Sequence, residues 1–343
     1  MGLQIGSIVS KKSIEFSELK DKIILVDAFN ALYQFLTTIR QPDGTPLMDS
    51  KGRVTSHLSG LFYRNLNLLQ EGMKLVYVFD GKAPAMKKRT QEKRAEVKDE
   101  AREKYEQAVE EENIEEMGKY AKQLAFLNEE MIQESKELLK AMGMAVIQAP
   151  AEGEAQASFM ASHDKNIFAV ASQDYDALMF KAPRLIQNLT LARKRKTISG
   201  FVEVTPQIIE LKEVLKELNI NQEQLICLAI LSGTDYNPGG VKGIGPKKAL
   251  KLVQEHKTKE KIFSAIENFE KEGKYKLDFD WKEIYDLINN PEVDKNAKIE
   301  FPKMNIEKIK KILLEHDFSE ERINNQIEKL NELKEKQKQR TLF

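Results

Sequence analysis

The sequence predicts an α/β fold: a central, mostly parallel sheet with helices on both faces. Three runs rich in β-branched or aromatic residues, 23–26, 75–79 and 167–171, have the length and composition of buried parallel strands. An Asp follows each run within three residues. Because the carboxyl ends of parallel strands meet at one edge of such a sheet, this repeated placement indicates a functional site at that edge.

The elements between these strands follow an α/β pattern. Helices are expected at 28–39 and 55–70, joined by a loop with Pro and Asp-Gly turn signals. A helix at 131–142 leads into a weaker strand at 145–147. Residues 83–130 are rich in Lys, Arg, Glu and Gln and have few apolar residues, so we expect a solvated helical hairpin or a disordered insert. Its place directly after a strand end is also typical of a lid over the site.

The second half of the chain is expected to be mainly helical from Asn221 onward. Before that point we expect a basic loop at 193–196 and a helix that begins near Thr205 and Pro206. A capping box at Asn221 predicts a helix that ends near Gly233.

Seven acidic residues are predicted to meet at the active edge of the sheet. They lie at strand ends, at a helix start and after a helix end: Asp27, Asp80, Glu152, Glu154, Asp174, Asp176 and Asp235. Any one Asp could simply cap a helix. Seven carboxylates in one pocket would repel one another and raise each other's pKa unless cations neutralise them. Oxygen ligands without His or Cys favour Mg²⁺ or Mn²⁺ over zinc, and two such ions support phosphodiester hydrolysis.

Composition sets broad limits on the protein. There are 54 basic and 54 acidic residues, so the formal net charge is zero, but an acidic pocket leaves basic clusters elsewhere free to meet phosphates. The single cysteine, Cys227, excludes an intramolecular disulfide and lies in an apolar run typical of a buried helix. No run is long and apolar enough to span a membrane and no signal pattern is present, so we expect an intracellular monomer without a membrane partner.

A glycine-rich segment predicts a phosphate-binding hairpin. Gly243 and Gly245 allow a turn to approach a ligand with bare N–H groups, and Pro246 begins a helix whose positive dipole end faces the same way. Lys247 and Lys248 follow. A simple Gly-rich turn is the alternative. Because such a hairpin contacts the backbone of nucleic acid, we expect binding that is independent of base sequence.

Five motifs in order closely resemble the flap endonuclease family, and the likeness spans nearly the whole chain. They are Val26–Tyr33, Tyr77–Gly81, Ala149–Ala155, Ser172–Asp176 and Gly233–Gly240. The compact length is most similar to the archaeal branch. The resemblance implies a 5′ structure-specific endonuclease with 5′-3′ exonuclease activity, which removes 5′ flaps in lagging-strand maturation and long-patch base excision repair. In a cell without a nucleus, it would be cytoplasmic and associated with the nucleoid.

The resemblance also assigns roles to individual residues. The seven carboxylates match the family's two-metal site. Lys87 and Arg94 match a basic pair that steers the scissile phosphate and stabilises the transition state. Tyr33 matches an aromatic that stacks on a base, although its helical position alone would suggest core. Arg40 and Arg64 match phosphate contacts.

Three regions follow from the same resemblance. Residues 1–220 form the nuclease core, and an insert at about 82–130 matches the helical arch through which a single-stranded 5′ end threads. Residues 221–330 contain the helix-hairpin-helix element, which holds duplex DNA and often a K⁺ ion, and a C-terminal helical region. Residues 331–343 are expected to be a flexible tail.

The tail carries part of the family's sliding-clamp motif. Gln339 and Leu342 occupy the first and fourth positions, but Phe343 is the only aromatic, so weak clamp binding is expected. Three other functions stay open: a bubble or junction endonuclease of the same superfamily, a non-catalytic DNA-binding clamp adaptor, and a metal-dependent phosphatase of small molecules. The last would need neither the hairpin nor the arch.

Overall fold

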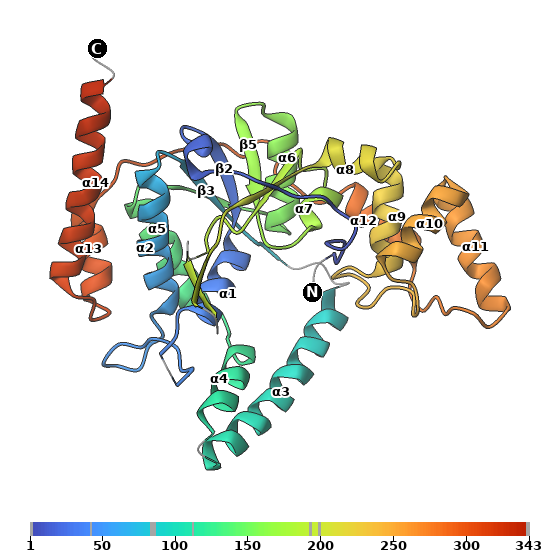
Figure 1. Cartoon of the computed structure of the whole chain (residues 1–343), viewed down its shortest axis with the longest axis horizontal. Coiled ribbons are helices and arrows are strands. Elements are labelled where there is room, and N and C mark those ends of the chain that lie inside the picture. Colours follow the sequence, from blue (N-terminus) through green and yellow to red (C-terminus); the bar gives the residue numbers. More distant parts are fainter. Residues whose placement is uncertain are drawn as a thin grey trace.

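A computed structural model describes residues 3–41, 43–82, 87–111, 113–191, 194–197 and 200–340. Within them, one mixed sheet has seven strands in the order β1-β9-β6-β5-β2-β3-β4 (Figure 1). The strands of this sheet are β1 (Lys12–Ser13), β2 (Ile23–Asp27), β3 (Lys74–Phe79), β4 (Ala145–Gln148), β5 (Ile167–Ala171), β6 (Arg184–Gln187) and β9 (Gln207–Glu210). Strands β6, β5, β2, β3 and β4 are parallel, whereas β9 is antiparallel to β6 and to β1. The predicted parallel core of the sheet is confirmed.

Helices cover both faces of the sheet, as predicted. Successive side chains of a strand point to opposite faces, so Ile24 and Val26 enter one core and Leu25 the other. The first core is built with η1 (Phe16–Leu19), α1 (Ala28–Thr38), α2 (Ser56–Gln70), α5 (Glu129–Ala141), α13 (Ile306–Leu314) and α14 (Glu320–Arg340). The second is built with α6 (Gly153–His163), α7 (Asp176–Met179), α8 (Leu211–Glu217), α9 (Gln222–Ser232), α10 (Pro246–His256), α11 (Lys259–Lys271) and α12 (Trp281–Asn289). Figure 1 shows α13 and α14 on the opposite side of the molecule from α10 and α11.

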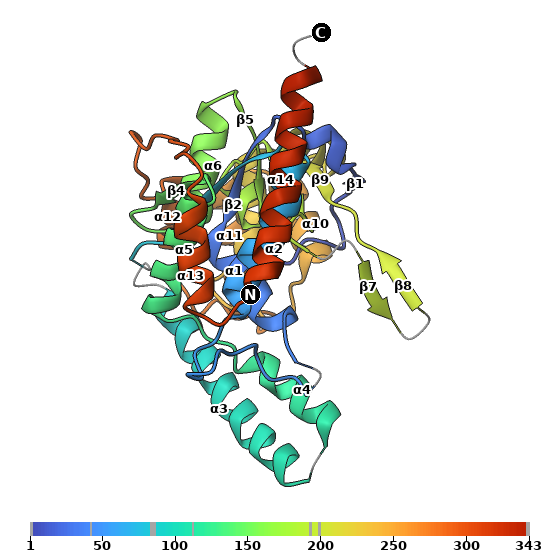
Figure 2. The ribbon, with the colours of Figure 1, turned by 90° about the vertical axis from the view of Figure 1, so that its left-hand side faces the viewer.

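The charged insert is a helical hairpin, one of its two expected forms. Helices α3 (Lys88–Glu110) and α4 (Ile114–Gln123) pack against each other and project from the body (Figure 2). Helix α4 also contacts the loop after α1, where a Cβ added to Gly44 would lie only 2.3 Å from the Cα of Gly118. Gly44 is therefore needed where the hairpin rests on the body.

Two expectations for residues 194–210 are wrong, and Arg193 lies outside the described residues. Lys194–Thr197 is not a loop but strand β7, which pairs antiparallel with β8 (Gly200–Glu203); Figure 2 shows this ribbon standing away from the body. The helix expected near Pro206 begins only at Leu211, because the intervening residues form β9. There the sheet overrides local signals: β9 pairs with β6 and β1, and Ile209 is buried.

Residues 331–340 of the predicted tail belong to a helix. Helix α14 continues to Arg340, and Leu330, near its middle, is fully buried. Residues 341–343 lie outside the described residues. Among the helices of the described residues, none is long and apolar enough to cross a membrane.

Candidate active site and metal centre

The carboxyl ends of the parallel strands bring acidic side chains together, as predicted. Asp27 is the last residue of β2, Asp80 follows β3, and Asp174 follows β5. All three interact electrostatically: burial raises the pKa of Asp27 to about 8, and the charges of Asp80 and Asp174 add to the rise. The sheet therefore concentrates negative charge at one edge.

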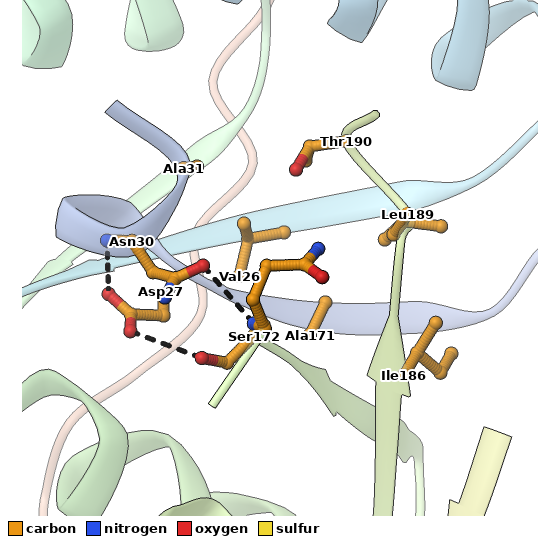
Figure 3. A pocket seen from close by; sticks show the side chains of 10 residues that line it. Val26, Asp27, Asn30, Ala31, Ala171, Ser172, Ile186, Leu189 and Thr190 are labelled. Carbon is orange, nitrogen blue, oxygen red and sulfur yellow. Dashed lines mark hydrogen bonds between the residues drawn. The ribbon is translucent and has the colours of Figure 1, made fainter. Parts of the chain in front are cut away.

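Asn30 connects Asp27 to Asp174 across this edge. Figure 3 shows Asn30 beside Asp27 and Ser172. Its backbone N–H donates to Oδ1 of Asp27 (3.0 Å), and its side-chain amide donates to Oδ2 of Asp174 (3.1 Å). Its carbonyl Oδ1 accepts the N–H of Gln173 (3.1 Å), and Ser172 Oγ lies 3.4 Å from Oδ2 of Asp27. Asp27 is thus a helix N-cap as well as a member of the cluster, so the two roles are compatible.

The start of α6 adds two more carboxylates. The N–H of Gly153 donates to Oδ1 of Asp80 (2.6 Å), which places Glu152 and Glu154 beside the strand ends. The pKa of Glu154 is raised well above its ordinary value, by burial first and then by neighbouring charges, of which Asp27 contributes most. Its Oε1 atom is buried and has no hydrogen-bond partner within the described chain. Such an orphaned oxygen fits a ligand for a cation.

Asp176, the first residue of α7, is held by the amino-terminal segment. The N–H of Leu3 donates to its Oδ1 (2.5 Å) across 173 positions of sequence. Burial, followed by the charges of Asp174 and Asp235, raises the pKa of Asp176 to about 7. The amino-terminal segment therefore reaches the cluster.

Asp235 is delivered by a buried turn after α9. Asn237 Oδ1 accepts from the N–H and Oγ1 of Thr234 (3.1 and 2.7 Å), and the Asn237 amide donates to the carbonyl of Ile230 (2.7 Å). Tyr236, which the sequence did not single out, is buried next to Asp235 and hydrogen-bonds to Glu152. Burial and then Glu152 raise the pKa of Tyr236 above its ordinary value.

Lys87 contacts the cluster from the base of the arch. Its Nζ lies 2.5 Å from Oε1 of Glu152 and 3.8 Å from Oδ2 of Asp235. Burial acts to lower the pKa of Lys87, but the carboxylates outweigh it and raise the pKa above its usual value. Arg94 belongs to α3, and its side chain lies outside the described part of the structure.

The seven predicted carboxylates are therefore neighbours, linked through mutual electrostatic effects. Across the described residues, no group of three or more His, Cys, Asp or Glu side chains is arranged to hold a metal ion. Several of these carboxylates instead accept backbone N–H groups, and Glu152 pairs with Lys87.

Comparisons with known proteins identify the family of this chain. The model of the XPG N-terminal domain matches residues 3–101, and that of the XPG I-region matches residues 143–235. Flap endonuclease 1 of Pyrococcus furiosus is 51% identical over 345 aligned positions, which cover 100% of this chain and 98% of the relative. The chain belongs to the flap endonuclease family. Flap endonuclease 1 of Thermococcus onnurineus is 50% identical over the same coverage, and both sources are archaea, in agreement with the predicted branch.

Solved structures support the assignment. The flap endonuclease-1 from Methanococcus jannaschii has a TM-score of 0.74 and 40% identity, with 97% of this chain and 98% of that chain covered. The catalytic core of Rad2 in complex with DNA substrate has a TM-score of 0.73 at 22% identity, covering 96% of this chain and 100% of that chain, and shares the fold.

In this flap endonuclease family member, the expected DNA contacts lie outside the cluster. Tyr33 on α1 is 39% exposed, although its helical position suggested core. Arg64 on α2 is half-buried, and burial lowers the pKa of its guanidinium. Arg40 also holds the chain after α1: its Nε donates to the carbonyl of Leu36 (2.8 Å) and its Nη1 to that of Gly44 (2.7 Å).

The predicted glycine hairpin forms between α9 and α10. Gly243 has φ +86°, a conformation that side chains disfavour, while Gly245 precedes Pro246 at the start of α10. A Cβ on Gly245 would meet nothing within 4 Å, so space lies open above the backbone. Lys247 and Lys248 are exposed.

The side chains of the three clamp-motif residues lie outside the described part of the structure. Gln339 lies in α14, but its side chain is outside the described residues. Leu342 and Phe343 lie outside them altogether.

Proposed function

We propose that this protein is a structure-specific endonuclease that hydrolyses phosphodiesters at the base of 5′ flaps in DNA, with accompanying 5′-3′ exonuclease activity. Removal of such flaps serves lagging-strand maturation and long-patch base excision repair. The observation that carries the proposal is the convergence of seven carboxylates at one sheet edge, next to the base of a helical arch. The flap endonuclease relatives, similar over the full chain, support the substrate class.

We propose Mg²⁺ as the cofactor, with two ions bound and Mn²⁺ able to substitute. The donor set consists of oxygens alone, as these ions prefer. The buried Oε1 of Glu154 has no hydrogen-bond partner among the described residues, and the pKa values of Asp27, Asp176 and Glu154 are raised; both observations support a need for positive charge. The proposed ligands are Asp27, Asp80, Glu152, Glu154, Asp174, Asp176 and Asp235. When bound, the cations supply an activated water and neutralise charge on the phosphoryl oxygens.

Lys87 and Arg94 are proposed to act on the scissile phosphate. Lys87 precedes α3 and already lies beside the carboxylates, so its ammonium can donate to a phosphate placed there. Arg94 lies in α3, less than two helical turns after Lys87. Preorganised cations of this kind stabilise the charge that develops in the transition state.

The remaining contacts are proposed to hold the branched DNA. Gly243 and Gly245 offer backbone N–H groups at a helix start, and Lys247 and Lys248 add charge, so duplex is bound through phosphates. A K⁺ ion at this hairpin is part of the proposal. Arg40 and the half-buried Arg64 are proposed to contact phosphate, and the exposed ring of Tyr33 is proposed to stack on a base.

Two proposals concern partners and assembly. We propose that the protein acts as a monomer. Gln339, Leu342 and Phe343 are proposed as a weak sliding-clamp ligand.

The products of cleavage test the proposed substrate. A double-flap DNA labelled at the 5′ flap should release the flap by incision at or next to its base, and a 3′ flap alone should stay intact. A Holliday junction and a bubble of the same sequences provide controls. Faster cleavage of the junction or the bubble would favour the alternative nucleases, and DNA binding without any product would favour a non-catalytic adaptor.

A further inference from the structure

Lys87 places a positive charge inside the carboxylate cluster. Its Nζ lies 2.5 Å from Oε1 of Glu152 and 3.8 Å from Oδ2 of Asp235. Burial raises the pKa of both Asp27 and Asp80, and Lys87 opposes that rise. Only 22% of the Lys87 side chain is exposed. The ammonium is therefore a counter-ion of the cluster and not a solvated surface charge.

An ammonium and a divalent cation compete for these oxygens. A magnesium ligand oxygen lies about 2.0–2.1 Å from its ion. An ion at that distance from Oε1 of Glu152 would be close to Nζ of Lys87, and two positive groups so near each other repel strongly in a partly buried site. It is therefore unfavourable for a divalent cation and the Lys87 ammonium to occupy the carboxylate of Glu152 at the same time.

We propose that Lys87 is an exchangeable counter-cation: its ammonium neutralises Glu152 and Asp235, and divalent cations displace it when they bind. The inference rests on the proposed cation binding by the carboxylates. It adds that Lys87 opposes cation binding in the DNA-free protein. By linkage, bound cations must weaken the Lys87–Glu152 contact by the same free energy.

Tyr236 offers the displaced ammonium a second position. Nζ of Lys87 already lies 5.5 Å from the centroid of the Tyr236 ring, within range of a cation–π interaction. The ring is buried, and the side chain of Tyr236 hydrogen-bonds to Glu152. A short displacement of the flexible side chain would thus move the Lys87 ammonium away from the Glu152 carboxylate and keep it within the site.

Cation affinity measured without DNA tests this inference. Mn²⁺ is titrated by electron paramagnetic resonance into the wild type, Lys87→Met and Lys82→Met at low ionic strength. Lys82 is an exposed lysine five positions earlier, so its variant controls for the loss of one nearby charge. Lys87→Met should bind Mn²⁺ about tenfold more tightly than the wild type, within the usual range of coupling between two sites, and Lys82→Met should match the wild type. Equal or weaker binding by Lys87→Met would overturn the inference.

Chemical modification follows Lys87 itself in the wild-type protein. A small acylating reagent is applied with and without Mn²⁺, and acetylation of Lys87 and Lys82 is quantified by mass spectrometry. Mn²⁺ should raise the rate at Lys87 and leave Lys82 unchanged; an unchanged or lower rate at Lys87 would contradict displacement. Absence of Mn²⁺ binding by the wild type and both variants would instead overturn the proposed function, and the inference with it.

Discussion

The backbone N–H of Gly153 donates a 2.6 Å hydrogen bond to Oδ1 of Asp80, and this contact joins the start of α6 to the end of β3. This close approach requires a glycine at position 153. A Cβ at position 153 would lie 2.8 Å from Oδ1 of Asp80 and 3.0 Å from the carbonyl oxygen of Val78. The orientation of Asp80 therefore depends on a missing side chain.

Gly153→Ala should lower single-turnover flap cleavage by at least about tenfold, because Asp80 must move by an appreciable part of an ångström and catalysis is sensitive to such displacements. The overall fold should persist, since Gly153 lies in the first turn of a helix and Ala favours helix. Ser162→Ala, on the exposed face of the same helix, is the control. Unchanged cleavage by Gly153→Ala would show that the position of Asp80 is not critical.

The raised pKa of Asp27 predicts an unusual dependence of protein stability on pH. This pKa is about 8 in the folded protein, against an ordinary value of 3.8, so the folded state binds the proton more tightly. The free energy of unfolding should therefore fall as pH rises from about 4 through 8. Asp27→Asn keeps a capping side chain and removes the charge. At pH 9 with a chelator present, it should be at least about 1 kcal/mol more stable than the wild type, the equivalent of roughly one pKa unit.

Urea denaturation at pH 5 and pH 9 measures this difference. The gain should be much smaller at pH 5, where Asp27 is protonated in the folded state. Asp99→Asn, on the exposed surface of α3, should show no such pH dependence. If Asp27→Asn were less stable than the wild type at pH 9, burial of the carboxylate would not carry the predicted electrostatic cost.

The basic pair of the arch should act on the chemical step. Lys87→Ala and Arg94→Ala should each slow single-turnover cleavage by roughly 10²-fold or more under saturating Mg²⁺, the scale of losing one preorganised contact to the transition state. Affinity for flap DNA should change far less. Lys104→Ala, exposed further along α3, is the matched control. A defect confined to binding would reassign both residues to the solvated face of the arch.

The glycine hairpin should set the affinity for duplex DNA. Gly245→Asp places a negative charge where a phosphate is proposed to meet backbone N–H groups, so it should weaken binding to all sequences alike and flatten the salt dependence. Gly245→Ala should have a much smaller effect, because a Cβ there meets nothing within 4 Å. Fluorescence anisotropy over a range of salt concentrations measures both. Equal affinities and slopes for Gly245→Asp and the wild type would reduce the hairpin to a simple turn.

The sequence predicted what depends on regular patterns. Strand ends are visible as apolar runs followed by Asp, so the convergence of Asp27, Asp80 and Asp174 followed from the topology of a parallel sheet. The capping box at Asn221 and the helix start at Pro246 were likewise local signals, and both are confirmed.

The features that the sequence did not predict depend on contacts between residues far apart in the chain. Asn30 contacts Asp174, 144 positions away, and Tyr236 packs beside Glu152; neither contact has a spacing rule, although both residues lie inside family motifs. The spacing of Asn30, three residues after the N-cap Asp27, was the one available signal. Strand β9 was missed because its pairing with β6 outweighs the local Thr-Pro helix signal.

The metal dependence of flap cleavage in the wild type and in Asp174→Ala tests the central claim most directly. Asp174 lies next to Asp27 and Asp176 and is proposed to bind a cation. The wild type should cut a labelled double-flap DNA only when Mg²⁺ or Mn²⁺ is present, while Asp174→Ala should bind the same DNA and cut it at least about 10²-fold more slowly at saturating Mg²⁺. Cleavage by the wild type in the presence of a chelator, or cleavage by Asp174→Ala within about tenfold of the wild type, would contradict the carboxylate cluster as a metal-dependent active site.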